Sequence, residues 1–160
     1  MEKSSHKIVT LPDAKARVAA WKKAGLKVVF TNGCFDLIHL GHVDYLEKAR
    51  MLGDKLVVGL NSDDSVSRFK GPERPLQDQT SRARVLAAMQ FVDCVVYFNE
   101  DTPLDLISEL IPDILVKGSD YLTENIVGAN VVQKAGGAVK TIDFVPGYST
   151  TRIVEKIRKS

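Results

Sequence analysis

Two histidines and an aspartate, placed closely around two glycines, are the residues of this sequence best suited to chemistry. They lie in the segment GCFDLIHLGH as Asp36, His39 and His42, with Gly33 before them and Gly41 between the histidines. An imidazole can donate hydrogen bonds to phosphate oxygens. A glycine can take a positive φ and lets another group approach the backbone closely. This combination predicts a site for a phosphate-bearing ligand.

A strand before this segment and a helix after it would position these groups. The apolar residues 28–30 predict a buried strand, and apolar residues recurring at helical spacing predict a helix from Leu40 to about Leu52. Both histidines then lie at or just before the helix N-terminus, where free N–H groups and the helix dipole favour an anion. The expected arrangement is strand, glycine turn and helix.

Two other interpretations of the histidines remain open. Cys34, Asp36, His39 and His42 could ligate zinc, although their spacing fits no common zinc pattern. The histidines could also be core residues, although two polar side chains beside a glycine turn are hard to bury with their hydrogen bonds satisfied. We favour phosphate over metal, and metal over core.

The composition is that of an ordinary globular domain. The 160 residues are 44% hydrophobic and 26% charged, with a net charge of +2, which is too small to indicate nucleic-acid binding. No apolar run approaches the roughly 20 residues of a membrane span, and the N-terminus does not resemble a signal peptide. The two cysteines show no motif, which favours reduced thiols. We predict a single cytoplasmic domain over residues 1–160, with no membrane or nucleic-acid partner.

Strands alternate with helices along the chain. Strands are predicted at 27–32, 55–61, 92–98, 113–118 and 139–144, and helices at 11–24, 40–52, 80–90, 103–111, 125–135 and 152–159. Such alternation implies parallel pairing and right-handed crossovers. The predicted fold class is therefore α/β, a Rossmann-like three-layer sandwich with a five-stranded parallel sheet.

Polar residues and glycines directly follow several of the predicted strands. Asn61 ends the second strand, and Lys117, Gly118 and Asp120 follow the fourth. Because the carboxyl ends of parallel strands meet at one edge of a sheet, we expect these residues and the histidine segment to form one nucleotide-sized site. The Ser-Asp-Asp run after Asn61 is interpreted as a helix cap.

Two further segments carry cations and hydroxyl groups. The loop 69–76 contains a glycine, two prolines, Lys70 and Arg74, and it could close over phosphate groups. The last helix begins at the run Ser149-Thr150-Thr151-Arg152. Since one hydroxyl suffices for a helix cap, this run predicts a second phosphate site, although at least one hydroxyl could serve as the cap alone.

These groups suit transfer at phosphorus. The chain has no Walker A motif, dinucleotide fingerprint, nucleophile elbow or carboxylate pair for hydrolysis. Without an obvious nucleophile, the protein would position the reactants and stabilise developing charge. A phosphate monoester, with a second pKa of about 6, is largely ionised at neutral pH and needs no general base. The sequence assigns no role to Arg82 or Arg84.

The histidine segment also resembles a family signature. It matches the pattern G-x-F-D-x-x-H-x-G-H of the cytidylyltransferase-like nucleotidyltransferases, the HxGH type. Over residues 27–158, the segments TNGCFDLIHLGH, NSDDSV, KGPERP, LVKGSDY and FVPGYSTTRI together resemble the heptose 1-phosphate adenylyltransferases of that family. Tyr148 departs from the pattern, since many relatives have Ile or Leu there.

The resemblance implies roles for individual residues. His39, His42 and Lys70 would be catalytic, with the histidines stabilising the transition state and not acting as nucleophiles. The nucleotide would contact Asn32, Gly33, Cys34, Phe35, Gly41, Lys117, Gly118, Asp120, Ser149, Thr150, Thr151 and Arg152. The sugar phosphate would contact Asp36, Asn61 and Arg74.

The resemblance also implies substrates and partners. ATP and D-glycero-D-manno-heptose 1-phosphate would give ADP-heptose and pyrophosphate, for lipopolysaccharide core synthesis. Mg²⁺ would be bound through the ATP phosphates, with no metal site made by the protein alone. A homodimer is expected from the family, and the short segment before the first helix predicts a stand-alone form.

Three alternatives stay open. A cytidylyltransferase for glycerol 3-phosphate would share the chemistry, because the choice of base depends on backbone contacts that a sequence shows poorly. A regulatory module would bind ATP without releasing pyrophosphate. A nucleic-acid-binding domain using the Thr-Thr-Arg helix is disfavoured by the near-neutral charge.

Overall fold

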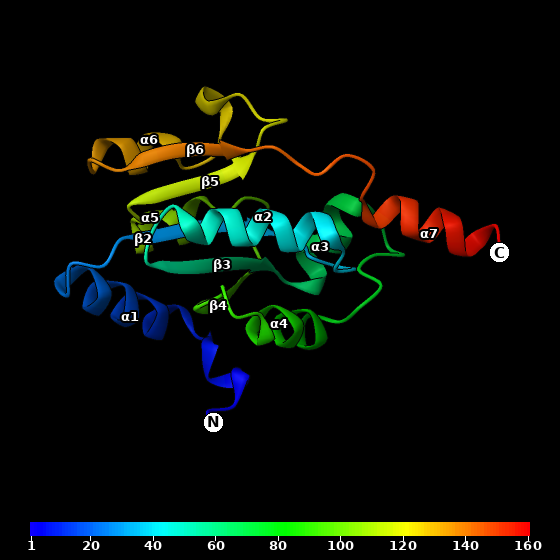
Figure 1. Ribbon diagram of the computed structural model, residues 1–160, viewed down its shortest axis with the longest axis horizontal. Helices are drawn as coiled ribbons and strands as arrows, with labels where there is room; N and C mark the ends of the chain where they lie inside the picture. Colours follow the sequence, from blue (N-terminus) through cyan, green and yellow to red (C-terminus); the bar gives the residue numbers. More distant parts are fainter.

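Six parallel strands form one sheet, and helices cover both of its faces (Figure 1). The computed structural model describes residues 1–160. The strands are β1 (Ile8–Val9), β2 (Val28–Gly33), β3 (Lys55–Asn61), β4 (Cys94–Phe98), β5 (Ile114–Gly118) and β6 (Ala138–Ile142), in the spatial order β1-β4-β3-β2-β5-β6. The helices are α1 (Leu11–Lys23), α2 (Leu40–Met51), α3 (Asp63–Lys70), α4 (Gln79–Ala88), α5 (Leu104–Leu110), α6 (Ala129–Lys134) and α7 (Thr150–Arg158), with 3₁₀ turns η1 (Ser4–Lys7) and η2 (Thr123–Asn125). None of the helices is long and apolar enough to cross a lipid bilayer.

The predicted α/β class and the parallel pairing are confirmed. The predicted number of strands is wrong, because the sheet has a sixth strand, β1, at its edge. β1 pairs with β4 through two residues only, Ile8 opposite Val95 and Val9 opposite Val96. Two residues are too few to show the alternation from which a strand is predicted.

The segment after β5 also differs from the prediction of one helix over 125–135. η2 and a turn come first, and α6 begins only at Ala129. Gly128 causes the interruption, because its φ of +84° lies in the left-handed region and cannot continue a helix. The last strand likewise ends at Ile142, two residues before the predicted end.

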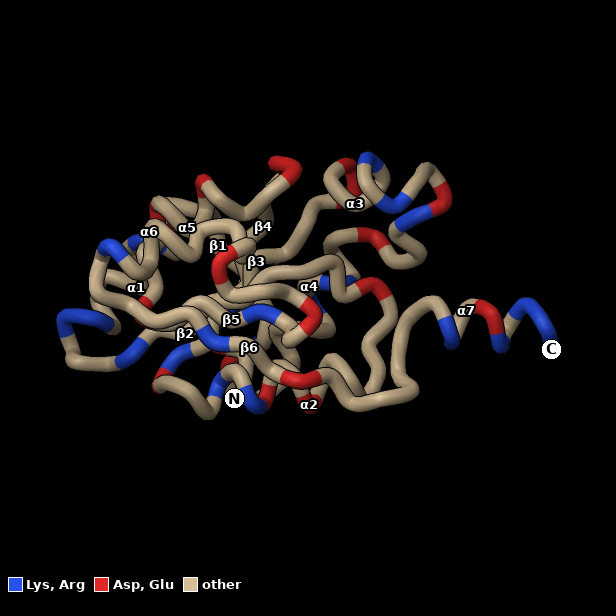
Figure 2. The backbone as a smooth tube through the Cα atoms, turned by 90° about the horizontal axis from the view of Figure 1, so that it is seen from above, with Lys and Arg blue, Asp and Glu red and all other residues tan.

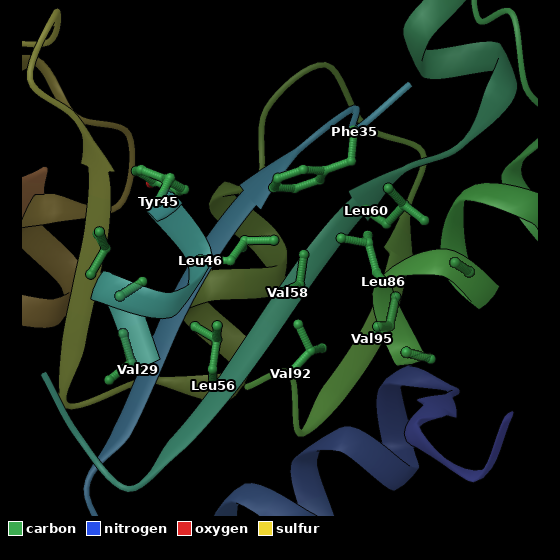
Figure 3. Close-up of a cluster of buried hydrophobic side chains, with 14 of the residues drawn as sticks. Val29, Phe35, Tyr45, Leu46, Leu56, Val58, Leu60, Leu86, Val92 and Val95 are labelled. Carbon is green, nitrogen blue, oxygen red and sulfur yellow. The ribbon is translucent and has the colours of Figure 1, made fainter. Parts of the chain in front are cut away.

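Alternate residues of each strand enter different layers of the core. In β2, Val29 packs in the layer that contains α2 and α4, whereas Val28 and Phe30 pack in the layer that contains α1, α5 and α6. Figure 3 shows the first layer, with Leu46 of α2 and Leu86 of α4 over the sheet. Burial on both faces explains the continuous apolar runs from which the strands were predicted.

The direction of the chain across the sheet reverses beside β2. From β2 the chain continues outward to β3 and β4, and it then returns to β5 on the other side of β2. β2 and β5 pair at Val29–Ile114 and Phe30–Leu115. In open α/β sheets such a reversal creates a crevice at the carboxyl ends of the strands, and ligands bind there.

A buried hydrogen bond fixes α2 beside this crevice. The hydroxyl oxygens of Tyr45 and Thr31 lie 2.8 Å apart, and Thr31 donates to the carbonyl of Val116 at 3.1 Å. Burial raises the pKa of Tyr45 to about 12, so the phenol stays protonated and donates to Thr31. The bond therefore links α2 to both strands that border the crevice.

Tyr45→Phe should lower the free energy of unfolding by about 1 kcal/mol, because it removes one buried hydrogen bond. Tyr148→Phe is the control, since the Tyr148 side chain is exposed. Urea denaturation of both variants measures the effect. Equal stabilities of the two variants would contradict the role given to the Tyr45 hydroxyl.

Candidate active site

A cavity of about 570 Å³ opens at the carboxyl ends of β2, β3 and β5. This volume lies within the usual range for sites that bind small molecules. Twelve residues singled out in the sequence line it: Asn32, Gly33, Cys34, Phe35, Asp36, His42, Asn61, Lys70, Lys117, Gly118, Asp120 and Thr150. The structure thus brings together segments that lie far apart in the sequence.

The other six candidates do not line this cavity: His39, Gly41, Arg74, Ser149, Thr151 and Arg152. Arg74 and Thr151 line a neighbouring cavity instead. Ser149 caps α7, where its hydroxyl accepts a hydrogen bond from the N–H of Arg152 at 3.2 Å. One of the three hydroxyls thus serves as the cap, and a second, Thr150, lines the main cavity.

The turn after β2 takes its shape from Phe35. Its φ of +47° is a left-handed conformation that a bulky residue rarely adopts. The left-handed residue of this turn is thus Phe35 and not Gly33. Gly33 is needed for space instead, because a Cβ there would lie 3.0 Å from the Phe35 ring. Strain of this kind tends to be kept at functional sites, where the surrounding structure enforces it.

The two histidines stack at the N-terminus of α2. Their ring centroids are 3.8 Å apart with 24° between the planes, and the Phe35 ring lies 5.3 Å from His42. His39 is the N-cap residue, so both imidazoles lie at the positive end of the helix dipole. A Cβ at Gly41 would come within 3.0 Å of the His39 ring, so a glycine there permits this arrangement.

Burial keeps both imidazoles neutral at pH 7. It lowers the pKa of His39 and of His42, and the neighbouring His39 lowers the latter further, to about 4. The Nδ1 atoms of both rings are buried without a hydrogen-bond partner, as is Oδ1 of Asn32. Buried polar atoms are normally paired, so the unpaired atoms of Asn32 and His42, which both line the cavity, mark a place where a polar ligand fits.

Neither alternative interpretation of the histidines fits this geometry. The chain contains no group of three or more His, Cys, Asp or Glu side chains placed to hold a metal ion. A core role is excluded because His42 is only partly buried and lines the cavity. A phosphate site at the helix end remains the interpretation that fits.

Asp36 holds the loop that precedes α4. Its carboxylate, only 3% exposed, accepts hydrogen bonds from the N–H groups of Leu76 and Gln77 at 2.8 to 2.9 Å. Arg74 approaches the same carboxylate at 3.5 Å. Although Asp36 lines the cavity, its oxygens are largely occupied by this loop.

Lys117 places a cation at the end of β5. Burial lowers its pKa, and the Asp120 carboxylate opposes that shift. The ammonium lies 5.5 Å from the ring centroid of Tyr121. At Gly118 a Cβ would overlap the ring of Phe144. This end of the cavity therefore offers a cation and aromatic surfaces, which suit a phosphate and a base respectively.

Arg82 is the main residue to which the sequence gave no role. Its side chain is 1% exposed, and it donates to the carbonyls of Cys34 at 2.8 Å, Asn61 at 2.9 Å and Gln77 at 3.0 Å. It also pairs with Asp63 at 2.7 Å. One guanidinium thus joins the turn after β2, the end of β3 and the loop before α4. Arg84, on the same helix, is exposed.

Several lining residues were not predicted, and many of them are aromatic or follow β4 and β5: Tyr45, Phe69, Phe98, Asp101, Thr102, Pro103, Tyr121, Asn125, Ile126, Val127 and Phe144. The segment 101–103 follows β4, so it could have been predicted from the rule that ligands bind at the carboxyl ends of parallel strands. The aromatic residues carry no such signal, because the direction of a loop side chain depends on a backbone that the sequence does not specify.

Fold and site together define an α/β domain of the nucleotide-binding type, with a histidine pair at the switch point of the sheet. The profile of the Cytidylyltransferase-like family matches residues 30–156, so the chain belongs to this family. The class predicted from the signature, the nucleotidyltransferases, is thereby confirmed.

Curated relatives extend this similarity along almost the whole chain. The bifunctional protein HldE of Magnetococcus marinus is 58% identical over 153 residues, 96% of this chain and 31% of the relative. The bifunctional protein HldE of Azorhizobium caulinodans is 57% identical over 151 residues, 94% of this chain and 32% of the relative. The chain thus spans about a third of the length of these relatives.

Two solved structures resemble the fold. The lipopolysaccharide core biosynthesis protein from Thermoplasma volcanium is 31% identical, with a TM-score of 0.60 over 76% of this chain and 98% of that one. Pantoate-beta-alanine ligase from Francisella tularensis is 14% identical, with a TM-score of 0.61 over 96% of this chain and 78% of that one. The latter shows a shared fold only.

Arg82→Met should lower the free energy of unfolding by about 3 to 5 kcal/mol, because it leaves buried carbonyls unpaired and removes the partner of Asp63. Arg84→Met, an exposed change on the same helix, should alter stability by less than about 0.5 kcal/mol. Chemical denaturation compares the two. Similar losses in both variants would contradict the joining role of Arg82.

Acidification should weaken the fold through His42. Its pKa is lowered from 6.5 to about 4, so between these values the unfolded chain binds a proton that the native protein does not. Stability therefore rises with pH in this window and is lost as the pH falls. His42→Gln should flatten the dependence, and His6→Gln, an exposed change, should not. Parallel profiles for wild type and His42→Gln, measured by denaturation at several pH values, would contradict the assignment.

Proposed function

We propose that this domain transfers AMP from ATP to D-glycero-D-manno-heptose 1-phosphate, giving ADP-heptose and pyrophosphate for lipopolysaccharide core synthesis. The observation that carries the proposal is the meeting of His42, Lys70 and Lys117 in one nucleotide-sized cavity at the switch point. Family membership gives the reaction class. The acceptor is supported by the HldE relatives and by the Thermoplasma neighbour, described as a lipopolysaccharide core biosynthesis protein.

In the proposed reaction, an oxygen of the acceptor phosphate attacks the α-phosphorus of ATP. A new phosphorus–oxygen bond forms as the bond to the bridging oxygen breaks, and pyrophosphate leaves with that electron pair. The acceptor is already ionised, so no general base is required. No protein side chain forms a covalent bond to the substrate.

The protein contributes charge and position. N–H groups of His39 and His42 would donate to phosphate oxygens that gain charge in the transition state. Lys70 and Lys117 would offset the charge of the phosphates, and the turn 32–35 would contact the nucleotide together with 118–120. The start of α7, residues 149–152, would hold the terminal phosphates through hydroxyls, N–H groups and Arg152.

The donor set of this chain fits Mg²⁺ only as part of the nucleotide complex. No three side chains of the types that ligate metals converge, so the protein offers no cage of its own. Mg²⁺ commonly binds through substrate phosphates with one or two carboxylates and several waters, and Asp101 and Asp120 line the cavity. When bound, the ion would neutralise charge on the leaving pyrophosphate.

The comparisons do not favour the cytidylyl alternative with glycerol 3-phosphate. We extend the proposal to a single cytoplasmic domain, as expected from the composition, and to a homodimer, as expected from the resemblance. Sedimentation of the purified chain at several concentrations would test the dimer.

Pyrophosphate release tests the proposed function. With Mg²⁺, the protein should release pyrophosphate from ATP and heptose 1-phosphate, and not from CTP, GTP or UTP, nor with glycerol 3-phosphate as acceptor. Release with CTP and glycerol 3-phosphate would keep the mechanism and overturn the substrates. Binding of ATP without release in any combination would indicate a regulatory module.

His39→Ala and His42→Ala should each reduce kcat by about 100-fold or more, while the Kd for ATP stays within about threefold of wild type. The reason is that these groups act chiefly on charge that develops in the transition state. His6→Ala, far along the chain from the site, is the matched control. Wild-type turnover in either variant would remove the proposed role.

A further inference from the structure

A second cavity, of about 440 Å³, lies beside the first and shares Lys70 with it. Its walls are the segment 70–74 after α3 and one side of α7, including Thr151, Val154 and Glu155. Figure 2 shows both segments at the same end of the molecule, with basic and acidic residues on each. The reaction described so far gives roles to Lys70 and Thr151 at the edge of this cavity, but none to Glu73, Glu155 or Arg158.

The side chains around this cavity are mostly charged. Lys70, Arg74 and Arg158 are cations, and Glu73 and Glu155 are carboxylates, whereas Pro72 and Val154 are apolar. Cations bind phosphate, and carboxylates accept hydrogen bonds from hydroxyl groups. The lining therefore suits a ligand that carries both a phosphate and several hydroxyls.

The charged groups are available for such a ligand. The pair between Arg158 and Glu73 spans 3.8 Å, and both side chains are more than two-thirds exposed. Exposed ion pairs contribute little to stability, so replacing this contact by contacts with a ligand would cost little free energy. Glu155 forms no ion pair.

The residues first assigned to the acceptor are less available. The carboxylate of Asp36 is occupied by the N–H groups of Leu76 and Gln77. The side-chain N–H₂ of Asn61, only 5% exposed, donates to Ser65 at 3.0 Å. Arg74 alone of the three lies in the second cavity. Recognition of the sugar must therefore come largely from other groups.

We propose that the second cavity is the acceptor subsite, where the sugar phosphate binds while ATP occupies the first cavity. This inference rests on the proposed function. The acceptor phosphate lies toward Lys70, the residue common to both cavities, and faces the α-phosphate of ATP across it. Glu155 and Arg158 contact the sugar hydroxyls and determine which acceptor is used.

Leaving pyrophosphate is the rival occupant, and the charges argue against it. Three cations against two carboxylates leave one net positive charge in the lining. Pyrophosphate carries more charge than a sugar monophosphate and has no hydroxyl donors for Glu73 and Glu155. Carboxylates beside it would repel it, whereas they would accept hydrogen bonds from a polyol.

The test measures the KM of each substrate in Glu155→Gln and Arg158→Ala. Loss of one charge-assisted hydrogen bond should raise the KM for heptose 1-phosphate about tenfold, with the KM for ATP within about twofold. Lys156→Ala removes a charge from the same helix outside the cavity and should behave as wild type. Calorimetric titration of heptose 1-phosphate into the same proteins gives a readout that does not need turnover.

An unchanged KM and Kd for heptose 1-phosphate in both variants would overturn the subsite. So would weaker product inhibition by pyrophosphate in Arg158→Ala with an unchanged KM for the acceptor, because the cavity would then hold pyrophosphate. Failure of the proposed function is distinguishable, since wild-type protein would then release no pyrophosphate from ATP and heptose 1-phosphate.

Discussion

The buried guanidinium of Arg82 is the interaction on which the site depends most. It binds the carbonyls that end β3 and follow β2, together with a carbonyl in the loop before α4. Those three segments contribute the turn at Phe35, Asn61 and the loop that Asp36 also holds. A strained turn such as that at Phe35 persists only when its neighbours fix it, and Arg82 provides this constraint through its hydrogen bond to the carbonyl of the adjacent Cys34.

The cavity combines neutral histidines with two lysines, which suits the proposed phosphate ligands without a strongly basic surface. The histidine pair is neutral at pH 7, because burial lowers the pKa of both rings and the proximity of His39 lowers that of His42 further. The cations Lys70 and Lys117 both line the cavity, from the ends of α3 and β5. This accounts for a nucleotide-sized site in a chain whose net charge is only +2. Lys70 further joins the two cavities, which places it where two substrates would meet.

Much of the fold and of the cavity could be predicted, because both follow from simple periodicities. Continuous apolar runs predicted the five long strands, and the residues at and after the ends of these strands located part of the lining. β1 was not predicted, because two residues are too few to show the alternation of apolar and polar residues that marks a strand. The structural role of Arg82 was not predicted. Arginine is almost never fully buried, so no sequence pattern indicates that this side chain lies in the interior. The left-handed residue of the turn after β2 is Phe35 and not a glycine, so no residue preference marks it in the sequence. The commitment of Asp36 to a loop likewise depends on long-range contacts.

The central claim is a single direct displacement between two bound substrates, with the histidines as hydrogen-bond donors. The stereochemical course at the α-phosphorus tests it most directly. An ATP analogue with sulfur in place of one α-phosphate oxygen has a chiral phosphorus, and the configuration of the product sugar nucleotide can be read by ³¹P NMR. One in-line displacement predicts inversion. Retention would require two displacements through a covalent intermediate, for which His39 or His42 would be the nucleophile, and it would contradict this account.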